Sequence, residues 1–552
     1  MVEAKCIEVD NKQATLASAD PGAQPKLNNE QWQALIALHR TLLHEHHDFF
    51  LASQHPSASP ALRRLASKYA MPARMWRHGI HSFLELLRHR LPASLDHMLA
   101  FIYLAYSMMA LLYETVPAFE DTWIECLGDL GRYRMAIEDD DIRDREVWTG
   151  VARHWYSKAS DKSPTTGRLY HHLAILARPN ALQQLFYYSK SLCVAVPFVS
   201  ARESILTLFD PVLNADNGQG QYRLPPLDTA FVKAHGLLFT NKEMGQRFES
   251  TVNEFLGLLD NQIGRVTRKF MEQGYHIAVA NSVAMLGFAS KDNILMRAIS
   301  SSANDDGDIQ MEGISPDDSS PSFKNAQRLN NSTLDIVLQR IGDPNVLPFI
   351  HVTLVFMYRM SRHPGAMSIL RADFPWELLA IMLNTLLVSL EITGPIENDT
   401  FPSPEKDDVR PLPEDFALRG LLWAEDYFPA DWFTNEKIDE EEKYHERASM
   451  TAQRKERILW LAVRVARSAL SGLKYDSGKL PNTKPQFSSR IEPNASRSST
   501  FESIASATIA SSNSIDRQEM WPLVDRPGDN EYPSDREDDE EAFPAPDPSP
   551  RV

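Results

Sequence analysis

Cysteine is nearly absent from this chain of 552 residues: Cys6, Cys126 and Cys193 are its only three, and they lie far apart. No Cys-x-x-Cys pair occurs, so the sequence indicates neither a disulfide framework nor a zinc ribbon. We infer that the protein works in a reducing compartment. The N-terminal residues have no continuous apolar stretch, so we expect no signal peptide.

An excess of positive charge and a long apolar run are missing as well. The chain carries 57 lysines and arginines against 74 aspartates and glutamates, a net charge of -17. This balance disfavours nucleic-acid binding by bulk attraction, so any such contact must come from a local basic patch. The longest apolar run, 374–392, is interrupted by Glu377, Asn384 and Glu391. Because a membrane-spanning helix needs about 20 mostly apolar residues, we predict a buried core helix here and no membrane partner.

Motifs that carry catalysis are also missing. The sequence contains no P-loop, no Gly-x-Gly-x-x-Gly and no Gly-x-Ser-x-Gly. The segment HEHHD (44–48) resembles a zinc motif, but Asp48 stands where the second histidine belongs. His171 and His172 are adjacent, so on a helix they point about 100° apart and cannot chelate together. We therefore predict that the protein is not an enzyme and binds no metal or cofactor.

Helical periodicity runs through most of the sequence, whereas alternating β-branched runs are scarce. One stripe steps by four, four, three and four residues, as on one face of a helix. Its members are Phe255, Leu259, Ile263, Val266 and Phe270. We predict an all-α fold.

Three segments lack this periodicity and are too polar to bury a core, so we predict that they are disordered. They are residues 1–27, a linker at 301–325 and a tail at 473–552. The tail holds six acids among the seven residues 535–541, which is typical of a solvated segment. We expect the tail to be dispensable for folding.

Two stretches around residue 165 follow the spacing of a tetratricopeptide repeat. Ala152, Tyr156, Ala159 and Pro164 match its second helix and turn, and Tyr170, Leu173, Ala174 and Ala177 match the first helix of the next repeat. Phe186 falls where a small residue is usual, so the second repeat is degenerate. Most aromatic side chains of 167–192 are therefore expected to lie in the core of a helical hairpin.

The region 147–202 is locally basic, with seven cations and one acid, Asp161. Two interpretations stay open: a solvated helical face, or a surface that attracts phosphate groups on protein or nucleic acid. The candidates for such a surface are Arg153, Lys158, Arg168, Arg178, Lys190 and Arg202.

Arg132 lies just upstream, in the segment CLGDLGRYR. A phosphate group needs several converging cations, because it presents three acceptor oxygens. Arg134 is two residues away, about 200° around the same helix, so it cannot share an anion with Arg132. A partner would have to come from a neighbouring helix, and the segment ARMWRHGIH (73–81) supplies candidates. The alternative is a structural ion pair.

Several ordered motifs resemble the ever-shorter-telomeres/SMG family of telomerase-associated proteins and nonsense-mediated-decay adaptors. They are LGDLGRYR, GRLYHHLAILA, LFYYSKSL, AHGLLFT, RILWLAVRVA and the segment PLPEDFALRGLLWAEDYFPADWF (411–433), the last as found in fungi. The resemblance covers roughly residues 28–470. It implies a 14-3-3-like bundle with tetratricopeptide-like repeats over 28–207, helical hairpins of a DNA/RNA-binding region over 208–300, and a C-terminal helical domain over 326–472.

The resemblance also assigns candidate site residues. It places the phosphate-binding arginine of the 14-3-3-like pocket at Arg132, with Tyr133 beside it. The position of the family's partner lysine falls on His81, and a neutral histidine is a poor phosphate clamp near pH 7. Arg77, about one turn earlier, is the candidate substitute.

The function implied is a non-catalytic adaptor that binds a phosphorylated protein partner, such as a decay helicase, in the nucleus or the cytoplasm. One alternative is a telomerase-linked subunit that binds telomerase RNA, telomeric single-stranded DNA or mRNA. Another is a plain helical scaffold whose phosphate pocket is degenerate. Some family members end in a nuclease domain; we expect no nuclease activity here, since an acidic tail stands in its place.

Overall fold

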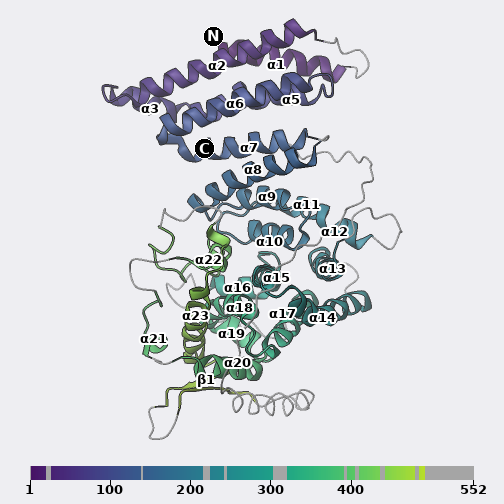
Figure 1. Ribbon diagram of the computed structural model, residues 1–552, viewed down its shortest axis with the longest axis vertical. Coiled ribbons are helices and arrows are strands. Elements are labelled where there is room, and N and C mark those ends of the chain that lie inside the picture. The colour runs from purple at the N-terminus through teal and green to yellow at the C-terminus, as the bar shows by residue number, and fades with distance from the viewer. Residues whose placement is uncertain are drawn as a thin grey trace, which may run out of the picture. The chain divides into compact units, whose positions relative to one another are not determined.

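Helices form nearly all the regular structure of the chain (Figure 1). The computed structural model describes residues 2–19, 27–138, 141–214, 224–241, 245–301, 320–390, 394–403, 410–434, 442–478 and 484–491. All of them belong to the compact unit Met1–Glu492. The all-α prediction is confirmed, because the only strands in these ranges are one antiparallel pair. The predicted domain boundaries stay predictions.

The helices run from the N-terminus to α23, and the strand pair follows them. The first elements are α1 (Val2–Ala19), α2 (Asn29–Gln54), α3 (Pro60–Lys68), α4 (Met71–Arg74), a π-helical segment (Met75–His81), α5 (Ser82–Arg88), α6 (Leu95–Thr115) and α7 (Glu120–Ala136). Next come α8 (Ile142–Lys162), α9 (Gly167–Leu176), α10 (Ala181–Leu192), α11 (Ala201–Ser204), α12 (Leu206–Leu213), α13 (Pro226–Thr240), α14 (Gln246–Val266), α15 (Lys269–Met285) and α16 (Ile294–Ser301). The last are α17 (Pro321–Gln339), α18 (Leu347–Ser361), α19 (Pro364–Leu370), α20 (Trp376–Val388), α21 (Gly394–Glu397), α22 (Pro413–Leu418), α23 (Ala448–Arg467), β1 (Leu473–Asp476) and β2 (Gln486–Ser489). Short 3-10 turns lie at Pro117–Phe119, Pro344–Val346 and Glu442–Tyr444.

The N-terminal helices pack as successive layers (Figure 1): α6 lies against α2 and α7, and α8, α9 and α10 follow in order. A Cβ at Gly131 would lie 3.2 Å from Ala152 Cα, so glycine allows α7 and α8 to approach closely. By length and composition α6 could span a membrane; its Phe101, Ile102 and Met109 side chains are buried in a core that also contains residues of α2 and α7.

Two predicted elements are present at the expected positions. Helices α9 and α10 form the predicted hairpin, with Tyr170, Leu173 and Phe186 buried. The apolar run 374–392 contains α20, whose Leu379 and Leu383 lie in the core. Another core helix, α18, packs against both α15 and α23.

The prediction of disorder is wrong for three stretches. Val2–Ala19 form α1, which packs on α2 with Cys6 buried, and residues 320–325 belong to the start of α17 and its cap. Strands β1 and β2 lie inside the predicted tail, where β1 packs on α23 and β2 on α20. There Asn384 donates to the Phe487 carbonyl at 2.9 Å and accepts from its N–H at 2.7 Å. These segments gain their order from distant partners. The rest of the predicted linker (302–319) and tail (492–552) lies outside the described residues.

Candidate functional site

Arg132 lies buried between α7 and α8, with 7% of its surface exposed. Its Nη2 donates to Asp129 Oδ1 at 3.2 Å, and the Tyr156 hydroxyl donates to the same oxygen at 2.5 Å. Burial works against the charge of Arg132, but the neighbouring Tyr156 and Asp129 outweigh it and hold the pKa of the guanidinium above its usual value. The geometry is therefore that of a buried ion pair.

Of the other predicted pocket residues, Tyr133 and His81 lie near Arg132. The Tyr133 hydroxyl donates to Glu85 at 2.8 Å, and its ring centroid lies 6.4 Å from that of His81. Burial lowers the pKa of His81 below its usual value, so the ring is neutral at pH 7. Arg77 lies on the π-helical segment, and Arg88 is the cation that pairs with Glu85, at 2.7 Å.

Acids balance the cations around this position. Arg88 pairs with Glu85, Arg132 with Asp129, and Arg168 with Glu125. A phosphate dianion would have to compete with three carboxylates for these guanidinium groups. Three buried nitrogen atoms of this cluster nevertheless have no hydrogen-bond partner within the described part of the chain: Arg132 Nε, His81 Nε2 and Arg88 Nε.

Each of the six predicted surface cations contacts another part of the chain. Lys158 donates to the Tyr113 hydroxyl, Arg168 pairs with Glu125, Arg178 reaches Thr207, and Arg202 donates to the Phe288 carbonyl. Arg153 donates to the Leu176 carbonyl at 2.9 Å and Lys190 to the Phe416 carbonyl at 3.0 Å. Of the six, Arg153 and Lys190 line a common cleft.

This cleft has a volume of about 390 Å³ and opens where α8, α9 and α10 face α15 and residues 416–419. Its aromatic lining consists of Tyr170, Phe186, Tyr187, Tyr275, Phe416 and Tyr444. Its charged lining consists of Arg153, Lys190, Arg419, Asp161 and Glu272. The cleft is thus aromatic, with a small excess of positive charge, on a chain whose net charge is -17.

A glycine brings the two sides of the cleft together. Gly420 has a φ of +84°, and any Cβ there would collide with the Pro164 carbonyl. The segment that follows is fixed by its backbone, since the Leu422 N–H donates to the Cys193 carbonyl at 3.0 Å. Arg419 is thereby held 3.6 Å from Asp161 on α8.

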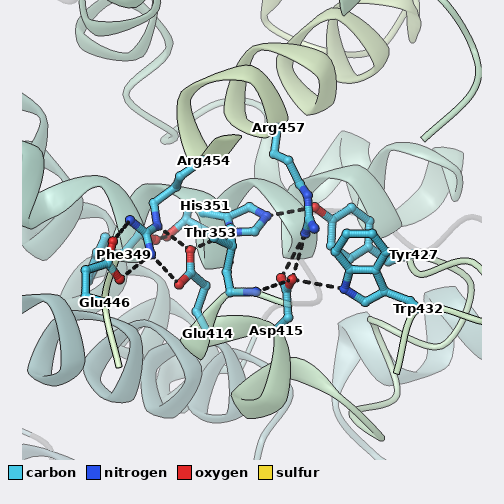
Figure 2. Close-up of polar contacts among 11 residues, drawn as sticks. Phe349, His351, Thr353, Glu414, Asp415, Tyr427, Trp432, Glu446, Arg454 and Arg457 are labelled. Atoms are coloured by element: carbon cyan, nitrogen blue, oxygen red, sulfur yellow. Dashed lines mark hydrogen bonds and ion pairs between the residues drawn. The ribbon is translucent and has the colours of Figure 1, made fainter. Parts of the chain in front are cut away.

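A buried polar network holds α22, which carries Phe416, against α18 and α23 (Figure 2). Arg454 donates to both oxygens of Glu414, at 2.5 and 2.9 Å, and also to Glu446. His351 bridges Glu414, at 2.9 Å, and the Tyr427 hydroxyl, at 2.7 Å. Burial alone would raise the pKa of Glu414, but Arg454 and His351 outweigh it and hold the pKa well below its usual value.

Asp415 forms the second half of this network (Figure 2). Arg457 Nη1 donates to both of its oxygens at 2.9 Å, and Trp432 Nε1 donates at 3.1 Å. The Arg457 guanidinium also lies 4.5 Å from the ring centroids of Phe401 and Trp432. Glu414 and Asp415 are both fully buried, so their role is to hold the C-terminal helices together.

Comparison with known proteins decides the family. The family model described as the Est1 DNA/RNA binding domain matches residues 152–427, half of the chain. The chain belongs to the Est1/SMG family.

Its relatives are matched over part of their length. Telomerase-binding protein EST1A of Danio rerio is 39% identical over 87 residues, 15% of this chain and 5% of that protein. Nonsense-mediated mRNA decay factor SMG7 of Danio rerio is 25% identical over 302 residues, 54% of this chain and 23% of that protein. EST/SMG-like protein 2 of Saccharomyces cerevisiae is 24% identical over 165 residues, 29% of this chain and 13% of that protein. The chain therefore spans less than a quarter of the length of these relatives.

A solved structure shares the fold. It is described as the crystal structure of Est1 and Cdc13, and the match covers 90% of this chain and 99% of that one, with a TM-score of 0.56 at 9% identity. At this identity the likeness establishes the helical architecture alone.

The structure gives this Est1/SMG family member a site that sequence reasoning missed. The buried Glu414–Arg454 and Asp415–Arg457 pairs had a signal in the sequence, because two arginines spaced by three interrupt the apolar face of 450–466. The aromatic cleft had no such signal in the sequence.

The two adjacent histidines of α9 each contact another side chain of the chain. His171 bonds to Ser204 at 2.9 Å, and His172 stacks on Tyr156. The described residues hold no cluster of three or more possible metal ligands.

Proposed function

We propose that this chain is a non-catalytic adaptor that binds a protein partner and acts in nonsense-mediated mRNA decay or telomere maintenance, in the nucleus or the cytoplasm. The aromatic cleft carries this proposal. Its walls come from helices far apart in the sequence, and a network of buried ion pairs positions the helix that carries Phe416. Rigid aromatic clefts suit the anchoring of partner side chains. We take the two processes from the names of two relatives, telomerase-binding protein EST1A and nonsense-mediated mRNA decay factor SMG7.

A phosphorylated partner is the finer form of this proposal. The unpartnered Arg132 Nε and His81 Nε2 support a phosphate site at the predicted position. The ion pairs of Arg132, Arg88 and Arg168 favour the structural alternative. Phosphate binding at Arg132 therefore requires that the ion pair between Arg132 and Asp129 breaks.

Nucleic-acid binding is the second candidate, because the matched family model is described as DNA/RNA binding. Binding to a single strand uses cations together with stacking aromatics. Arg153 and Tyr187 of the cleft lining are residues of those types. Telomerase RNA, telomeric DNA and mRNA are the ligands to test.

Affinity purification of the tagged full chain from its own cells tests the proposal. Bound RNA is sequenced and bound proteins are identified by mass spectrometry. We expect telomerase RNA or a decay helicase with the wild-type protein, and a loss of at least about tenfold in the double variant Tyr187→Ala/Tyr444→Ala. Tyr103→Ala is the matched control, since Tyr103 is 71% exposed on α6, away from the cleft. Equal recovery from all three proteins contradicts the proposal.

A further inference from the structure

Helix α6 is very apolar for a helix that is only partly covered. Residues 97–113 contain no lysine, arginine, aspartate or glutamate, yet only 39% of the apolar stretch of α6 is buried. Two large apolar side chains point outward, Tyr103 with 71% of its surface exposed and Leu111 with 43%. Because exposed apolar patches on a protein surface mark places where another molecule binds, this side of α6 is a candidate interface.

Five exposed residues of α6 are arranged symmetrically about its middle. They follow one another in steps of three, four, four and three, which keeps them on one side of the helix. We call them the α6 stripe: Ala100, Tyr103, Ser107, Leu111 and Glu114. Since the steps read the same in both directions, a second α6 that runs antiparallel can place its Leu111 opposite Tyr103 and its Tyr103 opposite Leu111. The two Ser107 residues then meet in the middle, as a self-complementary contact requires.

The polar side chains at the centre of the stripe can be buried at little cost. The Ser107 hydroxyl donates to the Tyr103 carbonyl of its own helix at 2.9 Å. Thr115, beside the stripe, donates to the Leu111 carbonyl at 2.7 Å in the same way. A hydroxyl that keeps its hydrogen bond avoids most of the free-energy cost of leaving water. Glu114 is the only charged member of the stripe, and it lies at one end.

Aromatic side chains of α8 widen the apolar face beside the stripe. The ring centroids of Tyr106 and Trp148 lie 6.1 Å apart, and those of Tyr113 and Trp155 lie 5.5 Å apart. Trp155 Nε1 donates to the Tyr106 hydroxyl at 2.8 Å, so these polar groups are satisfied within the chain. Val147, next to Trp148, is 60% exposed. The face therefore offers packing surface on two neighbouring helices.

We propose that the α6 stripe binds the α6 stripe of a second copy of this chain, with the two helices antiparallel about a two-fold axis at Ser107. The lack of charge favours a second copy over an unlike partner, because charged groups give interfaces between unlike proteins their specificity, whereas homodimer interfaces are more apolar. The cleft contains no residue of α6, so this inference does not rest on the adaptor function. A dimer would carry two clefts.

Sedimentation velocity of the purified full chain tests the dimer at concentrations from about 1 to about 100 µM. We expect the mean mass to rise from 62.5 kDa, the mass of one chain, towards twice that value. Tyr103→Glu/Leu111→Glu sets carboxylates against one another and should raise the dissociation constant at least about tenfold. Leu51→Glu/Tyr69→Glu is the matched control, because Leu51 and Tyr69 are 39% and 51% exposed outside the stripe, and it should change the constant by no more than about twofold.

A cysteine cross-link tests the arrangement of the two helices. The native cysteines are buried, so they give little background. Mild oxidation of Ser107→Cys should link two copies through the new thiols, whereas Ser67→Cys, exposed on α3, should not. A monomer at every concentration overturns the proposal, and undiminished dimerisation of Tyr103→Glu/Leu111→Glu overturns the assignment to α6. A dimer in which Ser107→Cys links no better than Ser67→Cys overturns the two-fold axis at Ser107.

Discussion

Arg454 holds Glu414 through two hydrogen bonds of 2.5 and 2.9 Å at a position where neither side chain is exposed to solvent. The pair joins α23 to α22, and α22 supplies Phe416 to the cleft. Removal of one partner from a buried pair leaves an uncompensated charge.

Arg454→Met should therefore lower the free energy of unfolding by about 3–5 kcal/mol, measured by chemical denaturation. The double variant Glu414→Gln/Arg454→Met should be more stable than the single one, because it no longer buries the Glu414 charge without its arginine. Arg359→Met removes the partly exposed pair with Asp426 and should cost about 1 kcal/mol or less. Equal losses of unfolding free energy in Arg454→Met and Arg359→Met would show that the buried pair contributes no more to stability than the partly exposed one.

Truncation after Ser471 should destabilise the chain. It removes the buried side chains of Leu473 and Phe487 and leaves Asn384 without its two backbone partners. We expect a loss of about 3 kcal/mol and a lower melting temperature. Truncation after Glu492 keeps the strand pair β1–β2 and should leave the melting temperature nearly unchanged. The expectation that everything beyond residue 472 is dispensable is thus revised. An unchanged melting temperature after truncation at Ser471 would restore it.

Arg132→Glu should disrupt folding as well as any ligand binding. The new carboxylate would face buried Asp129, and two like charges would share one site. We expect a loss of at least about 3 kcal/mol in the free energy of unfolding. Arg134→Glu should cost less, because Arg134 points to another side of α7, where it pairs with Glu138. A folded Arg132→Glu protein of wild-type stability that has lost phosphopeptide binding would favour the phosphate pocket over the structural pair.

Buried histidines should make the fold sensitive to acid. Burial lowers the pKa of His276 to about 3, and the unfolded value is about 6.5. The unfolded state therefore binds more protons below about pH 6.5, so stability falls as the pH falls towards about 3. Between pH 7 and pH 5, His276 should account for about 2 kcal/mol of that loss. His276→Phe should make the loss of stability between pH 7 and pH 5 smaller by about 2 kcal/mol, and an unchanged loss would refute the assignment.

Local pattern predicted most of the helices, but it missed α1. Phe255, Leu259 and Ile263 of the predicted stripe lie in α14, and all three are buried. The stripe does not continue as one helix to Phe270, because α14 ends at Val266 and Phe270 lies in α15. Repeat spacing predicted the α9–α10 hairpin at its observed position. These signals depend on residues a few positions from one another.

The site depends on residues far apart in the sequence, so local pattern could not predict it. Lys190 meets the Phe416 carbonyl across 226 residues, and Lys443 meets Asp161 across 282. The ion pair of Arg132 likewise depends on Tyr156 of the next helix, whose hydroxyl donates to the same Asp129 oxygen. Composition identified Lys190 as a cation of a basic region, but only tertiary packing made it a buried one.

Photo-cross-linking from the cleft tests the adaptor account most directly. The probe p-benzoylphenylalanine replaces Tyr187 in the full chain, and Tyr103 in the control, and the cross-linked products are identified after irradiation in cells. The account predicts a cross-link to a protein of the decay or telomerase machinery from position 187 and none to that protein from position 103. Recovery of the same partner by affinity purification, with no cross-link from position 187 or with RNA as the sole product there, would contradict it.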